Sequence, residues 1–152
     1  MAERKIVTIH QPESYPWMGF FNKMLIADHY IILDNVNFRK NYFQNRNQIL
    51  TRQGASYLTI PVETKNYRKI NEVRIAYQIN WKKKHFSSLI QNYSKSPFLK
   101  NYKPFFEELY SKDYELLIDF NMKIIYYLRE VLEISTPISM ASKLVPTGGS
   151  TQ

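Results

Sequence analysis

Residues 6–21 read IVTIHQPESYPWMGFF, and this stretch decides the fold. Its first four residues are apolar or β-branched, which is typical of a buried strand. Pro12 and Pro16 exclude regular structure from the segment between them. The strand therefore ends at His10 and Gln11, and it presents these polar side chains at its carboxyl end, where open α/β sheets build their binding sites.

A helix and a second strand are expected directly after this stretch. Apolar residues at helical spacing predict a helix over about 19–27, and residues 30–33 form a β-prone apolar run that ends at Asp34. A strand, a helix and a strand of this length make a βαβ unit, whose strands pair in parallel through a right-handed crossover. His10, Gln11 and Asp34 should then lie side by side at one sheet edge.

The rest of the chain adds fewer strands than helices. Residues 35–52 suggest a polar loop or a short extended segment, and 56–62 and 137–140 suggest further strands. Helices are expected from Asn80 onward, from Pro104 onward, and over 116–134, which has the strongest apolar stripe. We therefore expect an α/β fold with a mostly parallel central sheet, opened by the βαβ unit, and a mainly helical C-terminal half.

Length and composition limit the classes of protein. The chain has 152 residues, which suits a single domain over 1–152 or the N-terminal part of a longer domain. Cysteine is absent, so disulfides, thiolate metal sites and a cysteine nucleophile are excluded. No two histidines have metal-ligand spacing, and we expect neither a metal nor another cofactor. No signal-peptide core or membrane-length apolar run is present, which predicts a cytoplasmic protein without a membrane span.

The charge of the chain predicts an anionic partner. The formal net charge is +8, which favours a nucleotide, a phosphate, nucleic acid or a membrane surface. The basic residues are spread along the chain, and the single run of three, Lys82 to Lys84, is typical of a solvated face. An anionic small molecule is the partner that we expect first, with nucleic acid and a second copy of the chain as alternatives.

Two residues are candidates for catalysis. His10 could act as a general base, because its ordinary pKa is near the pH at which such chemistry runs, or it could bind phosphate. The structural alternative is a histidine that caps nearby backbone groups. Asp34 could orient His10 or bind a ribose hydroxyl, but an aspartate after a strand also commonly forms a turn.

Several other residues are candidates for substrate binding. Arg46, between Asn45 and Asn47, offers a guanidinium fork for phosphate or carboxylate, and Lys40 could support the same anion. The aromatic and remaining polar candidates are Gln11, Tyr15, Trp17 and His85. Tyr15 and Trp17 could stack on a base or a sugar ring, or pack in the core with a polar tip outside. His85 follows Trp81 by one helical turn, where a core tryptophan with a hydrogen-bonded histidine is the simpler interpretation.

These residues resemble those of the WbqC-like family, which is named for a protein encoded among bacterial O-antigen genes. The resemblance runs along the whole chain. Its most specific motifs are His10-Gln11-Pro12, Tyr15-Pro16-Trp17, Gly19-Phe20-Phe21, Asp34 with Val36 and Phe38, Lys40, Asn45-Arg46-Asn47, Leu58-Thr59-Ile60-Pro61-Val62, and Trp81 with His85. It implies a transferase of surface-polysaccharide biosynthesis that passes an acyl or aminoacyl group to a nucleotide-linked amino sugar.

Two other functions remain open. One is a non-catalytic basic domain that binds a nucleotide or nucleic acid. The other is a nucleotidylyltransferase-like enzyme, because a strand, a histidine-containing turn and a helix also begin that fold; this is a fold-level analogy only.

The final residues, 148–152, read as a glycine turn with helix-capping residues. The family usually continues beyond such a segment. We therefore expect that the chain is truncated, that it is catalytically incomplete, and that it exposes either a disordered C-terminus or an apolar patch.

Overall fold

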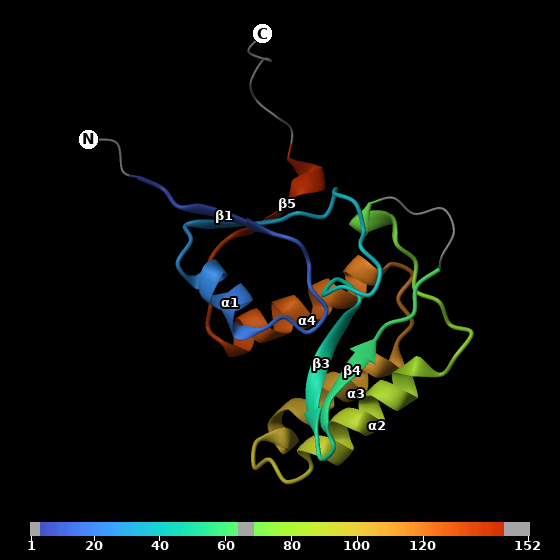
Figure 1. Cartoon of the computed structure of the whole chain (residues 1–152). Coiled ribbons are helices and arrows are strands. Elements are labelled where there is room, and N and C mark those ends of the chain that lie inside the picture. Colours follow the sequence, from blue (N-terminus) through green and yellow to red (C-terminus); the bar gives the residue numbers. More distant parts are fainter. Residues whose placement is uncertain (1–3, 64–68, 145–152) are drawn as a thin grey trace.

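The computed structural model describes residues 4–63 and 69–144. A parallel sheet forms one side of the molecule, with helices beneath it and a hairpin projecting away (Figure 1). The elements, in order, are β1 (Val7–His10), α1 (Met18–Leu25), β2 (His29–Ile32), β3 (Arg46–Thr51), β4 (Gly54–Thr59), η1 (Ile70–Glu72), α2 (Trp81–Tyr93), α3 (Leu99–Ser111), α4 (Leu117–Val131), β5 (Ile138–Met140) and η2 (Ala141–Lys143). This order confirms the α/β class and the mainly helical C-terminal half.

The predicted βαβ unit is present. β1 and β2 pair in parallel with His10 opposite Ile32, and β5 adds to the other side of β2, also in parallel. His10 and Leu33 therefore meet at the carboxyl edge of the sheet, where the Leu33 amide donates to the His10 carbonyl at 2.8 Å. The central inference from the sequence, that the ends of these two strands lie side by side, is confirmed.

Only one face of this sheet is covered by described elements. Tyr30 and Ile32 point inward and are fully buried against α1 and α4. Val7 and Ile9 point outward and are 54% and 47% exposed. The outer sheet face is therefore an exposed apolar patch. The prediction about the chain's end was based on residues 148–152, which lie outside the described residues.

Helix α4 joins two hydrophobic cores. Leu117, Phe120 and Ile124 belong to the core shared with α2, α3 and the segment after β4. Ile118 and Ile125, on the other side of the same helix, belong to the core under the parallel sheet. Residues three or four apart share a helix face, so one helix with two apolar stripes can bury both halves of the chain.

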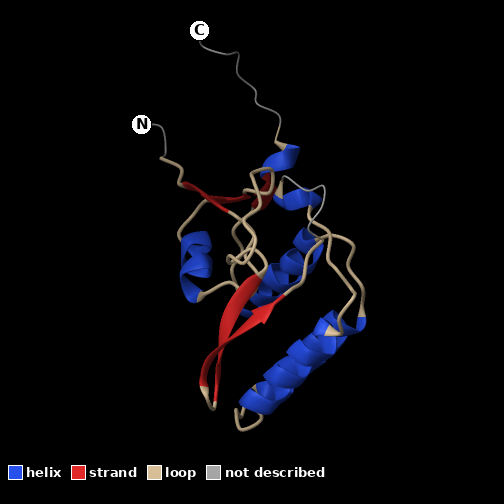
Figure 2. Cartoon of the chain, turned by 45° about the vertical axis from the view of Figure 1, so that its right-hand side comes forward, coloured by secondary structure: helices blue, strands red, loops and turns tan. Residues whose placement is uncertain are grey.

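The strand predicted over 56–62 is present in part, but it starts earlier, at Gly54, and pairs with a strand that was expected only as a loop or short extended segment. Residues 46–59 form an antiparallel hairpin, β3 with β4, which extends beside α2 (Figure 2). Its turn uses Gly54 at a φ of +107°, a backbone conformation that side chains rarely adopt. The expectation that a helix begins at Pro104 was wrong. Helix α3 begins at Leu99 and includes Pro104 on an exposed position, where water can satisfy the carbonyl that loses its partner.

Candidate functional site

A pocket of about 450 Å³ opens at the carboxyl edge of the parallel sheet. We call it the strand-end pocket. It is lined by Ile9, His10, Gln11, Glu13, Trp17, Leu33, Tyr42, Phe43 and Gln44. Three of the predicted site residues, His10, Gln11 and Trp17, therefore share one cavity, at the place where parallel α/β sheets bind ligands.

His10 faces a carboxylate in this pocket. Its Nε2 lies 3.7 Å from Oε1 of Glu13, and its Nδ1 lies 3.0 Å from the carbonyl oxygen of Gln11. The edge of its ring also contacts Phe20, with 5.2 Å between ring centroids. If Nδ1 carries the proton and donates to the Gln11 carbonyl, the lone pair of Nε2 is directed away from that bond and is available as a base.

Glu13 is the residue that the sequence analysis missed. It is only 5% exposed, and its Oε2 has no hydrogen-bond partner among the described residues. Burial raises the pKa of Glu13 above its ordinary value, and the nearby His10 opposes part of that rise. A buried carboxylate oxygen that lines a pocket without a partner is a natural acceptor for a ligand's N–H or O–H group.

Amide hydrogen bonds fix the opposite wall. Gln44 is buried, and its Nε2 donates to Oε1 of Gln11 at 2.6 Å. Its Oε1 accepts from the backbone amide of Arg39 at 2.7 Å. Asn121 of α4 donates to the Gln44 carbonyl at 2.8 Å, and Ser14 donates its amide to the Phe43 carbonyl at 2.7 Å. The pocket wall is therefore held by polar contacts between distant segments.

Trp17 lies exposed at the mouth of the pocket. The indole is held against the start of α1, where a Cβ on Gly19 would lie 2.0 Å from its Cη2. Trp17 remains 62% exposed, so a ring face is available to a ligand. Glycine at this position allows the flat ring to lie against the helix backbone.

Tyr15 packs against the core, which is one of the two arrangements expected from the sequence. Its φ of +51° places a bulky residue in the left-handed region, which is unusual. The conformation is held by Asn47, whose Nδ2 donates to the Tyr15 carbonyl at 2.8 Å, and by a contact between the hydroxyls of Tyr15 and Tyr110. Its ring packs against Phe120 in the core, so Tyr15 shapes the loop that leads to Trp17.

The hydrogen bonds of Asp34 point away from His10. Its Oδ1 accepts from the amide of Ser142 at 2.8 Å, and its Oδ2 accepts from the Ser142 hydroxyl at 2.5 Å. These bonds tie the end of β2 to η2 and satisfy the side chain of Asp34, which is only 2% exposed. The expected pairing of Asp34 with His10 is corrected by this geometry, because the carboxylate beside His10 is that of Glu13.

The predicted anion-binding group is divided among several places. Asn45 is buried and donates to the Ile60 carbonyl, so it ties the hairpin together. Arg46 lies over the ring of Tyr57, 4.2 Å from its centroid, on the hairpin. Lys40 is exposed and does not line the strand-end pocket. Arg39 is the missed cation, because its guanidinium lies 4.8 Å from the ring centroid of Tyr42, a pocket residue.

His85 belongs to the core. It is 3% exposed, its Nε2 lies 3.1 Å from the Thr59 carbonyl, and its ring packs edge-on against Trp81. Burial lowers the pKa of His85 to about 4, so the ring is neutral at physiological pH. His85 does not line the strand-end pocket, and its position is that of the alternative considered from the sequence, a hydrogen-bonded core histidine.

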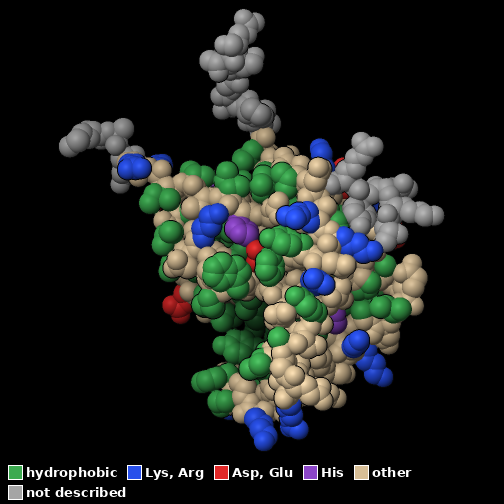
Figure 3. All heavy atoms as spheres, viewed as in Figure 1, with side chains coloured by type: hydrophobic (Ala, Val, Ile, Leu, Met, Phe, Trp, Pro, Cys, Tyr) green, Lys and Arg blue, Asp and Glu red, His purple; other side chains and the backbone are tan. Residues whose placement is uncertain are grey.

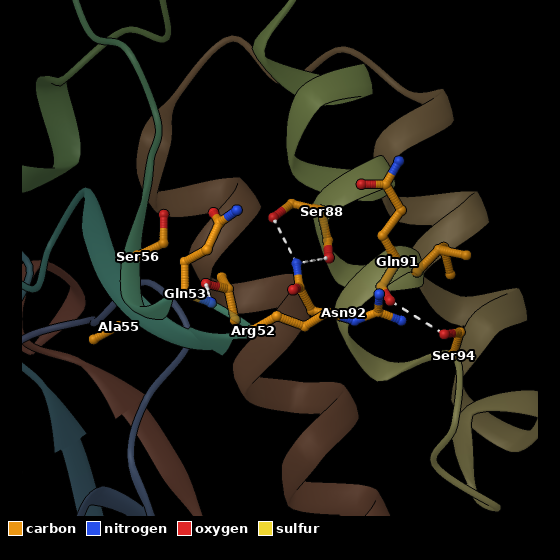
Figure 4. A pocket seen from close by; sticks show the side chains of 10 residues that line it. Arg52, Gln53, Ala55, Ser56, Ser88, Gln91, Asn92 and Ser94 are labelled. Atoms are coloured by element: carbon orange, nitrogen blue, oxygen red, sulfur yellow. Dashed lines mark hydrogen bonds between the residues drawn. The ribbon is translucent and has the colours of Figure 1, made fainter.

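A second, larger pocket lies between the hairpin and α2. Its volume is about 860 Å³. Figure 4 shows Gln53 and Ser56 of the hairpin facing Ser88 and Asn92 of α2. No carboxylate or imidazole lines it, and Arg52 is its single charged residue. Because it offers no acid or base, this pocket can bind polar groups but does not compete with the strand-end pocket for catalysis.

The molecular face at the sheet edge carries basic, acidic and hydrophobic side chains together. Figure 3 shows lysine and arginine side chains scattered around a histidine and a small acidic area, with hydrophobic side chains between them. Lys23 is one cation at this edge, since its Nζ donates to the Ile9 carbonyl at 2.6 Å. Over residues 4–63 and 69–144, no group of three or more histidine and acidic side chains could hold a metal ion, and no helix is long and apolar enough to cross a membrane.

Fold and pocket together define an α/β protein with a polar site at the carboxyl edge of a short parallel sheet. The chain belongs to the WbqC-like protein family, whose model matches residues 11–152. A relative from Mycobacterium tuberculosis (strain ATCC 25618 / H37Rv), "Uncharacterized protein Rv1507c", is 38% identical over 92 residues. The match covers 59% of this chain and 39% of that relative. No solved structure matches significantly.

Proposed function

We propose that this protein transfers an acyl or aminoacyl group to the amine of a nucleotide-linked amino sugar. The observation that carries the proposal is the buried Glu13 beside His10, with a carboxylate oxygen that has no partner among the described residues. Membership of the WbqC-like family agrees with a role associated with polysaccharide biosynthesis.

In this reaction His10 is the base. Nε2 of His10 takes a proton from the sugar amine as its nitrogen attacks the carbonyl carbon of an activated donor. A bond forms between that nitrogen and the carbonyl carbon, and the bond to the leaving group breaks with its electron pair. The proton then passes from His10 to the leaving group. Glu13, 3.7 Å from Nε2, stabilises the imidazolium between these two steps.

The rest of the pocket supplies binding. Trp17 offers an exposed ring face for a sugar or a base, and Gln11, fixed by Gln44, offers an amide to a hydroxyl. Arg39, beside Tyr42, is placed to meet the phosphates of the nucleotide. Arg39, Lys40 and Arg46 all lie outside the pocket lining, but Arg39 is held over the ring of Tyr42, which does line it.

Transfer and binding should be measured separately. The wild type and His10→Gln are compared for binding of a nucleotide-linked amino sugar by calorimetry, and for transfer from an activated acyl donor by mass spectrometry. The expected result is similar affinity and loss of about a hundredfold or more in rate for His10→Gln. A matched acceptor with an acetylated amine should bind and not react. Equal rates in both proteins would contradict the proposal.

A second comparison tests the phosphate contact. Arg39→Gln should weaken nucleotide binding by about tenfold, because it removes a charged donor beside the pocket. Arg46→Gln is the control, since Arg46 lies over Tyr57 on the hairpin. A larger loss for Arg46→Gln than for Arg39→Gln would place the phosphates elsewhere.

The alternative function is non-catalytic binding of a nucleotide or nucleic acid. The net charge of +8 and two arginines that lie over exposed tyrosine rings, Arg39 over Tyr42 and Arg46 over Tyr57, favour it. In that case affinity for single-stranded nucleic acid should fall steeply with salt, and no transfer should be observed.

A further inference from the structure

We propose that an apolar groove next to the strand-end pocket binds the hydrocarbon chain of an amphipathic ligand. The groove has a volume of about 500 Å³. Its main walls are Phe21, Leu89, Phe98, Tyr102, Phe106 and Leu128. None of the residues that line it is charged, and its volume is in the range of small-molecule sites.

Four helices meet around this groove. Phe21 comes from α1, Leu89 from the C-terminal half of α2, Tyr102 from α3 and Leu128 from α4. Tyr127, which lines the groove, stacks on the ring of Phe105 behind it, with 3.6 Å between centroids and 3° between planes.

The groove and the strand-end pocket are lined by consecutive residues at the start of α1. Trp17 lines the pocket, while its neighbours Pro16 and Met18 line the groove. The two cavities therefore adjoin at the start of α1, one lined by polar side chains and one by apolar side chains. An amphipathic molecule fits this division, with its polar head group beside His10 and Glu13 and its chain in the groove.

The exposure of the groove walls also favours a bound chain. Met18 and Phe98 are 68% and 63% exposed, although both line a concave surface. Large apolar side chains left in contact with water at such a site mark a place where a ligand buries surface. A hydrocarbon chain can bury these apolar side chains without requiring hydrogen bonds. Figure 3 shows a recess walled by hydrophobic side chains on this face.

This inference goes beyond the proposed transfer, because it holds whether or not His10 is a base. The probe is cis-parinaric acid, whose fluorescence rises when its chain leaves water. Displacement by butanoate, octanoate and dodecanoate measures the dependence on chain length. Affinity should rise by up to about fourfold for each methylene buried, until the groove is full.

Substitutions at Val131, a partly exposed groove residue at the end of α4, locate the site. Val131→Glu should lower affinity for cis-parinaric acid by about tenfold, because it places a charge against the chain. Val131→Trp, which fills space without adding charge, should lower it also. Ile79→Glu is the matched control, since Ile79 is 64% exposed and lies outside the groove.

Three results would overturn the proposal. The first is an affinity that does not depend on chain length. The second is an equal effect of Val131→Glu and Ile79→Glu while both variants keep the wild-type circular dichroism. The third is failure to bind the probe together with self-association that Val131→Glu abolishes in sedimentation, which would make the groove an interface between copies of the chain.

Discussion

The indole of Trp17 occupies the space that a side chain on Gly19 would need, because a Cβ there would lie 2.0 Å from the ring. The glycine in the first turn of α1 therefore sets the position of an exposed aromatic ring at the pocket mouth. Trp17 and Gly19, two positions apart at the start of α1, thus determine how a ligand can stack on the indole. This relationship leads to the first prediction.

Gly19→Ala should separate ligand binding from stability. The new methyl group forces the exposed Trp17 ring to move, which costs little, and alanine favours the helix by up to about 1 kcal/mol over glycine. We expect an unchanged or higher melting temperature, altered tryptophan fluorescence and weaker ligand binding. Trp17→Ala should weaken binding similarly, and the double variant should show no further loss. Additive losses would mean that Gly19 does not act through Trp17.

Glu13→Gln should stabilise the protein at neutral pH and impair its function. The pKa of Glu13 is raised by burial, so the folded state holds its proton more tightly than the unfolded state. Stability from this group is therefore greatest below the ordinary pKa of 4.5 and is lost as the pH rises through the folded value. The melting temperature of Glu13→Gln should exceed that of the wild type increasingly as the pH rises toward neutral. A difference that shrinks over this range would contradict the burial argument.

His85→Gln should change the response to acid without affecting the pocket. Burial lowers the pKa of His85 to about 4 from an ordinary 6.5. The contribution of the neutral His85 ring to the free energy of unfolding is complete above pH 6.5. It is lost as the pH falls toward 4, and the loss amounts to up to roughly 3 kcal/mol. Urea unfolding between these pH values should show this loss in the wild type and in His10→Gln, and a smaller one in His85→Gln. Ligand affinity at neutral pH should be unchanged.

Asp34→Ala should lower stability and leave binding intact. The carboxylate accepts two hydrogen bonds from Ser142, and losing them should cost about 2 kcal/mol or more of unfolding free energy. Ser142→Ala removes only the hydroxyl bond and should cost less. If Asp34→Ala instead abolished ligand binding or transfer with an unchanged melting temperature, Asp34 would belong to the site after all.

Much of the parallel sheet could be predicted from local sequence. The apolar run before His10, the helical spacing after Trp17 and the apolar run before Asp34 each specify one element, and a βαβ unit has one common handedness. The position of His10 and Gln11 at the sheet edge follows from these signals alone. The strand predicted over 56–62 overlaps β4, but β3 and its pairing with β4 could not be predicted in this way, because the residues of β3 alternate weakly and are only partly buried.

The tertiary structure decided which side chains share the pocket. Proximity in sequence made Asn45, Arg46 and Asn47 look like one anion site, but strand geometry sends successive side chains to opposite faces. Asn45 and Asn47 satisfy backbone carbonyls of distant segments, while Arg46 lies over Tyr57. No local pattern shows where such hydrogen bonds go.

Long-range contacts also decided which carboxylate, that of Asp34 or that of Glu13, lies beside His10. Sequence alone determined that a histidine ends β1 and that an acidic residue follows β2. The turn after β5 then supplied Ser142 as the partner of Asp34, while the chain between Pro12 and Pro16 folded back to bury Glu13 beside His10. The pairing depends on contacts between residues more than a hundred positions apart, such as Asp34 with Ser142, and these form only when the sheet and α4 pack together.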